Sequence, residues 1–147
     1  MGMKQILVVM AAVVLVGCSN GTRMADVLVS PSDEKLITDP IVEKEVRKEL
    51  KKPEGEITES DLGKVESIYL RNTQITDEGL KELAKLKKLD TLCLCDTQIT
   101  DKGLKEVAKL QNLKELDLSN TKSTKAGVAE LQKALPNCKI ISPQSSP

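Results

Sequence analysis

Cys93 and Cys95 are the side chains of this sequence best suited to chemistry, because two thiols one residue apart can act together. A pair of thiolates can hold a soft metal ion or be oxidised to a disulfide. The segment from Leu92 to Cys95 alternates leucines with cysteines at the period of a β-strand. We therefore expect both thiols on the outward face of one strand, with side chains that run parallel.

The predicted strand argues against a disulfide between Cys93 and Cys95. Residues i and i+2 of a strand have Cα atoms about 6.6 Å apart, whereas a disulfide requires Cβ atoms about 3.8 Å apart. A metal site would need further ligands, and the sequence has no histidine and no third cysteine placed to supply one. We predict no metal and no other cofactor. Three interpretations of the pair stay open: filler of a polar surface, contact with a ligand, or a redox or metal role.

Carboxylates are the remaining candidates for acid–base chemistry. Asp96 and Asp117 lie in or directly after short strand-like segments, and Glu115 is nearby. Paired carboxylates can hydrolyse glycosides, but the pair must flank the substrate in a cleft, and one member needs a raised pKa. A short open sheet offers no such cleft, so we predict no catalytic residue and a protein that is not an enzyme.

Composition excludes several classes of partner. Lysine plus arginine and aspartate plus glutamate both number 22, so no net charge favours nucleic acid. One tyrosine is the whole aromatic content, which leaves almost no material for stacking bases or for an aromatic cage. We expect neither a nucleic acid nor a small-molecule substrate as the partner.

The N-terminal segment is expected to direct export. Lys4 precedes an apolar run of 11 residues, Ile6 to Val16, which is too short to cross a bilayer and is typical of a secretory signal. The segment from Leu15 to Cys18 resembles the lipobox of bacterial lipoproteins. The resemblance implies a signal peptide over residues 1–17 and an acylated Cys18 as the first residue of the mature chain.

Localisation follows from the same resemblance. It implies that lipid chains on Cys18 attach an exported protein to the membrane of the cell envelope. Ser19 stands where lipoproteins retained in the inner membrane of Gram-negative bacteria usually carry aspartate, so the outer membrane is favoured if the source is Gram-negative. Residues 18–35 are mostly polar, contain Pro31 and lack periodicity, which predicts a flexible tether.

A repeat of 24 residues positions the cysteines and carboxylates. Leu70, Leu94 and Leu118 are equivalent, and residues 73–89 and 97–113 are identical at 13 of 17 positions. Each copy has the L-x-x-L-x-L spacing of leucine-rich repeats, and the Ile-Thr-Asp-x-Gly-Leu segment most resembles the cysteine-containing type. The combination with a lipobox also resembles leucine-rich-repeat lipoproteins of planctomycetes and related bacteria.

The resemblance implies an α/β fold, a short right-handed solenoid with parallel strands on the concave face and helices on the convex face. Within each coil, Leu92 and Leu94 or their equivalents should point inward. Asp77 and Asp101 stand where a helix N-cap would be. Two glycines lie in the first helical turn, which indicates either close packing between coils or a special backbone angle: Gly79 and Gly103.

Residues 36–63 are predicted to form an N-terminal cap and residues 64–142 the repeats, followed by a tail over 143–147. Asp39-Pro40 should begin the cap helix, and Thr58 to Asp61 resembles a capping box. Threonine replaces the motif's asparagine or cysteine at three equivalent positions, where its hydroxyl can bond a backbone turn: Thr73, Thr97 and Thr121. Cys138 is expected to face inward in the closing strand.

The outward strand face is the predicted binding surface, because solenoids of this kind bind partners there. Tyr69 and Arg71 are residue types enriched at binding hot spots; Tyr69 could equally cover the edge of the cap. The other predicted ligand-binding residues share this face: Asn72, Cys93, Cys95, Asp96, Asp117 and Ser119. We predict a lipid-anchored module for a protein or sugar-polymer ligand, or alternatively a structural envelope component that self-associates laterally.

Overall fold

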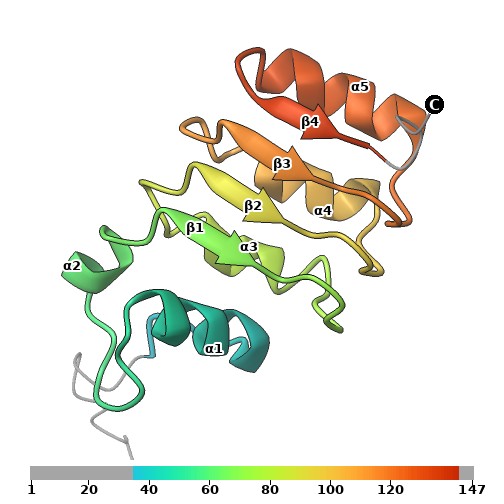
Figure 1. Cartoon of the computed structure of the whole chain (residues 1–147). Coiled ribbons are helices and arrows are strands. Elements are labelled where there is room, and N and C mark those ends of the chain that lie inside the picture. Colours follow the sequence, from blue (N-terminus) through green and yellow to red (C-terminus); the bar gives the residue numbers. More distant parts are fainter. Residues whose placement is uncertain (1–34, 143–147) are drawn as a thin grey trace, which may run out of the picture.

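The computed structural model describes residues 35–142, so the predicted signal peptide, Cys18, most of the tether and the tail lie outside the described residues. Four parallel strands form one sheet in chain order (Figure 1). Each strand has three residues: β1 (Ser67–Tyr69), β2 (Thr91–Cys93), β3 (Glu115–Asp117) and β4 (Lys139–Ile141). The register pairs Ile68 with Leu92, Leu116 and Ile140 in turn, so the 24-residue spacing of the sequence continues into the closing strand.

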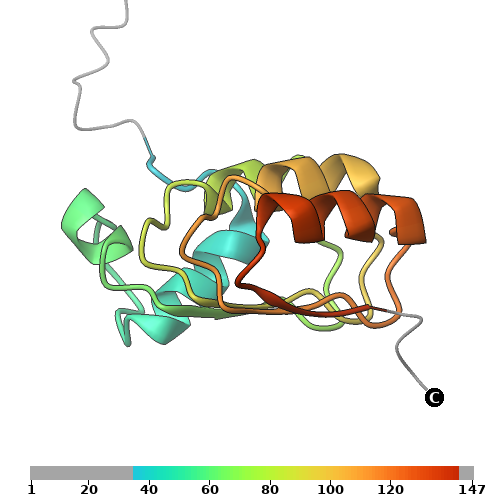
Figure 2. The same cartoon turned by 90° about the horizontal axis from the view of Figure 1, so that it is seen from above.

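Three helices connect the strands and lie together on one side of the sheet (Figure 2): α3 (Leu80–Leu83), α4 (Asp101–Val107) and α5 (Lys125–Ala134). This arrangement confirms the predicted layers of parallel strands and helices. The hand and curvature of the solenoid stay predictions. No helix within residues 35–142 is long and apolar enough to cross a membrane.

The core consists of leucines and isoleucines that repeat from coil to coil. Leu70, Leu94 and Leu118 have no exposed surface, and Ile75 and Ile99 are equally buried. Each fully buried side chain of this size contributes about 1.5–3 kcal/mol relative to an exposed one. Because one coil cannot cover both sides of its own leucines, stacking supplies the burial.

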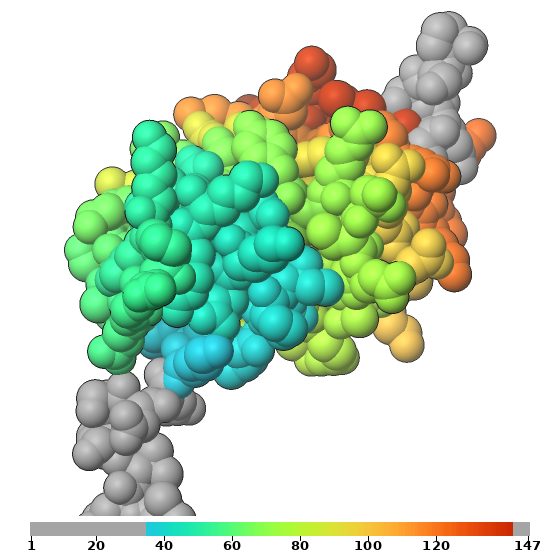
Figure 3. All heavy atoms as spheres, turned by 60° about the horizontal axis from the view of Figure 1, so that its bottom comes forward, coloured from blue at the N-terminus to red at the C-terminus, as the bar shows by residue number. Residues whose placement is uncertain are grey.

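Two helices precede β1 at the N-terminal end of the solenoid. The Asp39 carboxylate caps α1 (Pro40–Glu49), and Val42 and Val46 of that helix are completely buried. Side chains of α1 and of the segment before it spread over the N-terminal end of the solenoid (Figure 3). Thr58 and Asp61 form a capping box at α2 (Glu59–Leu62), so residues 36–63 protect this end of the core.

Asp77 and Asp101 do not cap the helices of their own coils, contrary to the prediction. Asp77 accepts hydrogen bonds from the amide and hydroxyl of Thr100 in the next coil, at 2.9 and 2.6 Å. Asp101 binds the amide and hydroxyl of Thr124 in the same way, at 2.8 and 2.6 Å. The threonines are the N-cap residues of α4 and α5. Each aspartate therefore joins two coils.

The helix glycines leave room for these aspartates. A Cβ atom at Gly103 would lie 2.5 Å from Asp77 Oδ1, and one at Gly127 would lie 2.2 Å from Asp101 Oδ1. Both distances are shorter than van der Waals contact, so the prediction of close packing between coils is confirmed. The repeated threonines act within a coil, because Thr73, Thr97 and Thr121 each donate to the carbonyl three residues earlier.

Candidate binding surface

The strand face is the outward side of the sheet together with the turn that follows each strand. Parallel pairing brings equivalent residues of adjacent coils side by side, so Tyr69, Cys93 and Asp117 form one row. All eight predicted ligand-binding residues lie on or next to this face. Its members from the first three coils are Ser67, Tyr69, Arg71, Asn72, Thr91, Cys93, Cys95, Asp96, Glu115, Asp117, Ser119 and Asn120.

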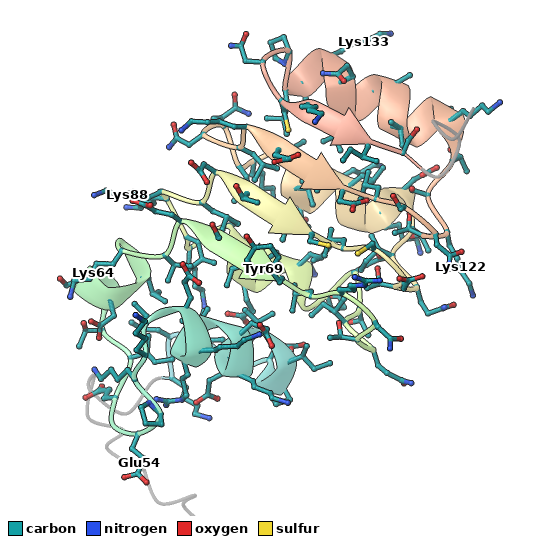
Figure 4. All side chains as sticks on the ribbon, in the orientation of Figure 1. Glu54, Lys64, Tyr69, Lys88, Lys122 and Lys133 are labelled. Atoms are coloured by element: carbon teal, nitrogen blue, oxygen red, sulfur yellow. The ribbon has the colours of Figure 1, made fainter. Side chains whose placement is uncertain are left out.

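Tyr69 is the one large apolar side chain among residues 35–142 that stands exposed, with 52% of its surface in solvent. Figure 4 shows the ring over β1, on the side of the sheet opposite the helices. Half of the ring is thus accessible to a partner, and its role as a contact residue or as a cover for the edge of the cap stays a prediction.

A polar hollow of about 540 Å³ follows the strands at one end of the face. Arg71 pairs with Asp96 across adjacent coils at 3.8 Å, and the Asn120 amide donates to Asp96 at 2.8 Å. The lining residues come from three coils: Arg71, Asn72, Asp96, Thr97, Gln98, Asn120, Thr121 and Lys122. Asn120 and Lys122 were not among the predicted site residues, although the repeat places Asn120 in the same column as Asp96.

Backbone geometry explains part of this column. Asn72, Asp96 and Asn120 have left-handed φ angles of 53°, 57° and 54°. Asparagine and aspartate adopt this conformation more readily than other residues with a Cβ. Asn72 and Asp96 are thus required by the turn that ends each strand, and their side chains are available to a ligand as a consequence.

Cys93 and Cys95 differ from the prediction that both thiols face solvent. Cys93 is half-buried, whereas only 8% of the Cys95 surface is exposed. Their sulfur atoms lie 2.8 Å apart as free thiols. The two thiols still meet on one face, as alternation predicts, although Cys95 lies beyond the end of β2. As a contact residue, Cys95 offers a partner little surface.

Asp117 lies beside the two thiols, because it pairs with Cys93 in the sheet. One carboxylate oxygen of Asp117 and the two sulfurs all lie within 4.8 Å of one another. Ser119 orients this carboxylate: its amide and hydroxyl both donate to Asp117 Oδ1, at 2.9 and 2.6 Å. The 24-residue repeat places Asp117 in the same row as Cys93. A carboxylate from the next coil could therefore have been predicted as a further metal ligand beside the two thiols, in addition to histidine and cysteine.

Electrostatics keeps Cys95 protonated. Burial raises the pKa of the Cys95 thiol to about 12, and the hydrogen bond with Cys93 and the charge of Asp117 act in the same direction. Burial also raises the pKa of Cys138. This residue is buried as predicted, but it precedes β4 (Lys139–Ile141) and is not part of the closing strand, because Ile140 is the residue that pairs with Leu116. Neither group is a thiolate nucleophile at neutral pH.

The helical face consists of the exposed side chains of α3 and α4 and of the residues beside them. Its charges form local ion pairs, unlike the side chains of the strand face. Its lysines pair with glutamates three residues earlier on the same helix turn. Lys85 lies 2.8 Å from Glu82 and Lys109 lies 2.6 Å from Glu106; Lys81 pairs with Glu78 in the same way. These charges satisfy one another and repeat from coil to coil.

A family model described as a leucine-rich repeat matches residues 64–84, which span β1 and most of α3. The chain contains a leucine-rich repeat. Together with the 24-residue period and the four-stranded parallel sheet, the match identifies the fold as an α/β leucine-rich-repeat solenoid. No curated protein matches this sequence.

Several solved structures resemble this leucine-rich-repeat chain. An internalin (InlF) of Listeria monocytogenes is 18% identical over 70% of this chain and 36% of its own, with a TM-score of 0.47. The Mex67:Mtr2 structure of Chaetomium is 20% identical over 73% and 74%, with a TM-score of 0.48. A leucine-rich-repeat protein of Leptospira interrogans is 25% identical over 55% and 26%, with a TM-score of 0.41. This chain spans about a third of the internalin and a quarter of the Leptospira protein.

Proposed function

We propose that this chain is a non-catalytic module that binds a protein partner through its strand face. Leucine-rich-repeat solenoids present their strands as an extended binding surface. The observation that carries the proposal is the exposed Tyr69 ring on that surface, next to Arg71 and the polar hollow. Tyrosine and arginine dominate the binding energy of many protein interfaces.

The chemistry of the face fits a protein better than a sugar polymer. A sugar-binding groove usually stacks rings on several aromatic side chains, and Tyr69 is the only aromatic residue of the chain. The hollow offers both charges, from Arg71, Asp96 and Lys122. A peptide or loop with an apolar residue for Tyr69 and mixed polar groups for the hollow matches this surface.

Attachment to the cell envelope is the second part of the proposal. It rests on the apolar run Ile6 to Val16 and on the lipobox-like segment that ends at Cys18. Lipid on Cys18 would leave residues 19–34 as a polar spacer before the first described residue. Substitution Cys18→Ser is expected to move the protein from the membrane fraction to the soluble fraction after cell lysis.

Self-association is the second candidate function, and the last coil favours it. Within residues 35–142, β4 pairs with β3 along one edge, and no strand pairs with its other edge. Beside it, a hollow of about 410 Å³ combines the apolar side chains of Val128, Ala129 and Ile140 with polar ones such as Thr124 and Gln132. Sedimentation velocity over a hundredfold range of concentration distinguishes the two functions: a monomer throughout favours partner binding, whereas dimers or longer stacks favour a structural component.

Site-specific photocrosslinking in the source cell tests the binding function. A photoreactive residue replaces Tyr69 on the strand face, and a matched chain carries it at Lys105, which is exposed on α4. A discrete adduct from position 69 alone supports the proposal and identifies the partner by mass spectrometry. Equal adducts from both positions, or none from either, would contradict it.

A further inference from the structure

We propose that Cys93, Cys95 and Asp117 form a binding site for a thiophilic divalent cation of the zinc class. Two thiolates come from one coil and the carboxylate comes from the next. Sulfur, nitrogen and carboxylate oxygen are the atoms that zinc uses in proteins, and three protein ligands with one open position is its usual arrangement in non-structural sites. The site lies within the strand face that is proposed to bind a partner, but its test does not require that partner.

The three ligand groups lie close enough together to form part of a tetrahedral site. With zinc–sulfur bonds of about 2.3 Å, the two sulfurs of a tetrahedral site are about 3.8 Å apart. Cys93 and Cys95 have sulfurs 2.8 Å apart, and a carboxylate oxygen of Asp117 lies within 4.8 Å of both. Binding therefore requires the two sulfurs to separate by about 1 Å, which small rotations of the side chains provide.

The carboxylate of Asp117 is already oriented for this role. Both hydrogen bonds from Ser119 end on Oδ1, which leaves Oδ2 as the oxygen for the cation. Hydrogen bonds of this kind fix the direction of a ligating group, and their loss typically costs 10–100-fold in metal affinity. Ser119 is thus a positioning residue in the proposed site.

The surrounding charge also suits a dication. Binding of the cation displaces the protons of both thiols. Two thiolates and one carboxylate then carry three negative charges, and a divalent cation neutralises two of them. Arg71 lies on the adjacent coil, where its positive charge pairs with Asp96 at 3.8 Å.

A chelate fits this pair better than a disulfide does. A disulfide needs Cβ atoms about 3.8 Å apart, whereas a chelate needs the sulfurs, rather than the Cβ atoms, at that distance. Cys93 is the last residue of β2, and Cys95 lies in the turn that follows it. The third ligand from Asp117 has no role in a disulfide.

Cobalt titration of the reduced protein tests the proposal, because Co²⁺ replaces zinc and thiolate coordination gives it an intense near-ultraviolet absorption. The full chain is used in detergent with Cys18→Ser, so that the lipidation site does not interfere. We expect one Co²⁺ per chain, and displacement by Zn²⁺. The Cys138→Ala variant is the control for a buried thiol. It should bind Co²⁺ as the Cys18→Ser parent does, since Cys138 lies outside the proposed site.

Three variants define the ligands. Cys93→Ser and Cys95→Ser should abolish the thiolate absorption, and Asp117→Asn should weaken Co²⁺ at least about tenfold while circular dichroism stays unchanged. Asparagine keeps an oxygen for Ser119, so loss of fold is not expected. Half a cobalt per chain, affinity unaffected by Asp117→Asn, or no absorption at 100-fold excess cobalt would each overturn the site.

Discussion

The strand face and the helical face belong to the same coils, yet their side chains follow different rules. On the helical face the pairs Glu82–Lys85 and Glu106–Lys109 occupy equivalent positions and satisfy each other. On the strand face the row Tyr69, Cys93, Asp117 changes residue type at every coil. Positions that repeat build the coil, whereas positions that change are free to serve a particular contact.

Repetition also identifies which aspartates are structural. Asp77 and Asp101 make the same two hydrogen bonds to the next coil, and the glycines at 103 and 127 accommodate them. Asp96 and Asp117 have no such common pattern: one pairs with Arg71 and the other with Ser119. The contacts therefore separate two structural aspartates, Asp77 and Asp101, from two aspartates of the strand face, Asp96 and Asp117.

The largest effect on the scaffold is expected from a repeated leucine. Leu94 has no exposed surface, so Leu94→Ala should lower the free energy of unfolding by about 2–5 kcal/mol through lost burial and a cavity. Urea denaturation followed by circular dichroism measures the change. Tyr69→Ala, on the opposite side of the same sheet, should lower the free energy of unfolding by less than about 1 kcal/mol. An equal loss for the two variants would contradict the distinction between repeated positions that build the coil and variable positions on the strand face.

A smaller scaffold effect is expected at the helix glycines. Gly103→Ala places a Cβ 2.5 Å from Asp77 Oδ1 and should cost about 1–3 kcal/mol of unfolding free energy. Gly63→Ala is the matched control, because its Cβ would lie 3.6 Å from its nearest atoms and φ is −69°. That control should be neutral or stabilising by less than about 1 kcal/mol. Equal midpoints for the two variants in urea would contradict the packing argument.

The bonds between coils should make stability depend on acid. The hydroxyl and amide of Thr124 lower the pKa of Asp101, so this aspartate stabilises the fold above its unfolded pKa of about 3.9, and the contribution is lost as pH falls further. Asp101→Asn should flatten the decline of the urea midpoint between pH 5 and pH 2. A decline as steep as that of the parent protein would show that Asp101 contributes nothing through its charge.

The smallest effect is expected on the helical face. Lys109 is exposed and pairs with Glu106 at 2.6 Å, and an ion pair at this spacing stabilises a helix by about 0.2–0.5 kcal/mol. Lys109→Ala should therefore shift thermal unfolding by no more than about 2 °C, and less in high salt. A loss above 1 kcal/mol would show that this face, too, holds the scaffold together.

The sequence predicted the repeated parts well because each coil supplies the same evidence again. Strand register, buried leucines, the capping box at Thr58 and the helix after Asp39 all follow from local spacing. Asp77 was assigned to its own helix because its partner, Thr100, is 23 residues away. Contacts between coils of this kind become visible only when one copy of the repeat is placed above the next.

The candidate site was predicted less completely. Alternation predicts the common face of the two thiols correctly, but it does not predict that Cys95 is buried in the turn that contains Asp96. The approach of Asp117 to both thiols depends on sheet register, which the repeat does specify. Side-chain exposure, such as that of Tyr69, depends on every neighbour and does not follow from spacing.

Affinity measurement with the crosslinked partner tests the central claim most directly. The isolated partner is titrated against the parent chain, Tyr69→Ala and Lys105→Ala, and thermal unfolding of all three is recorded in parallel. We predict about 30-fold weaker binding or more for Tyr69→Ala, as for a hot-spot residue, with the unfolding temperature nearly unchanged and with Lys105→Ala equal to the parent. Equal affinity of Tyr69→Ala and the parent would contradict the claim that the strand face is the binding surface.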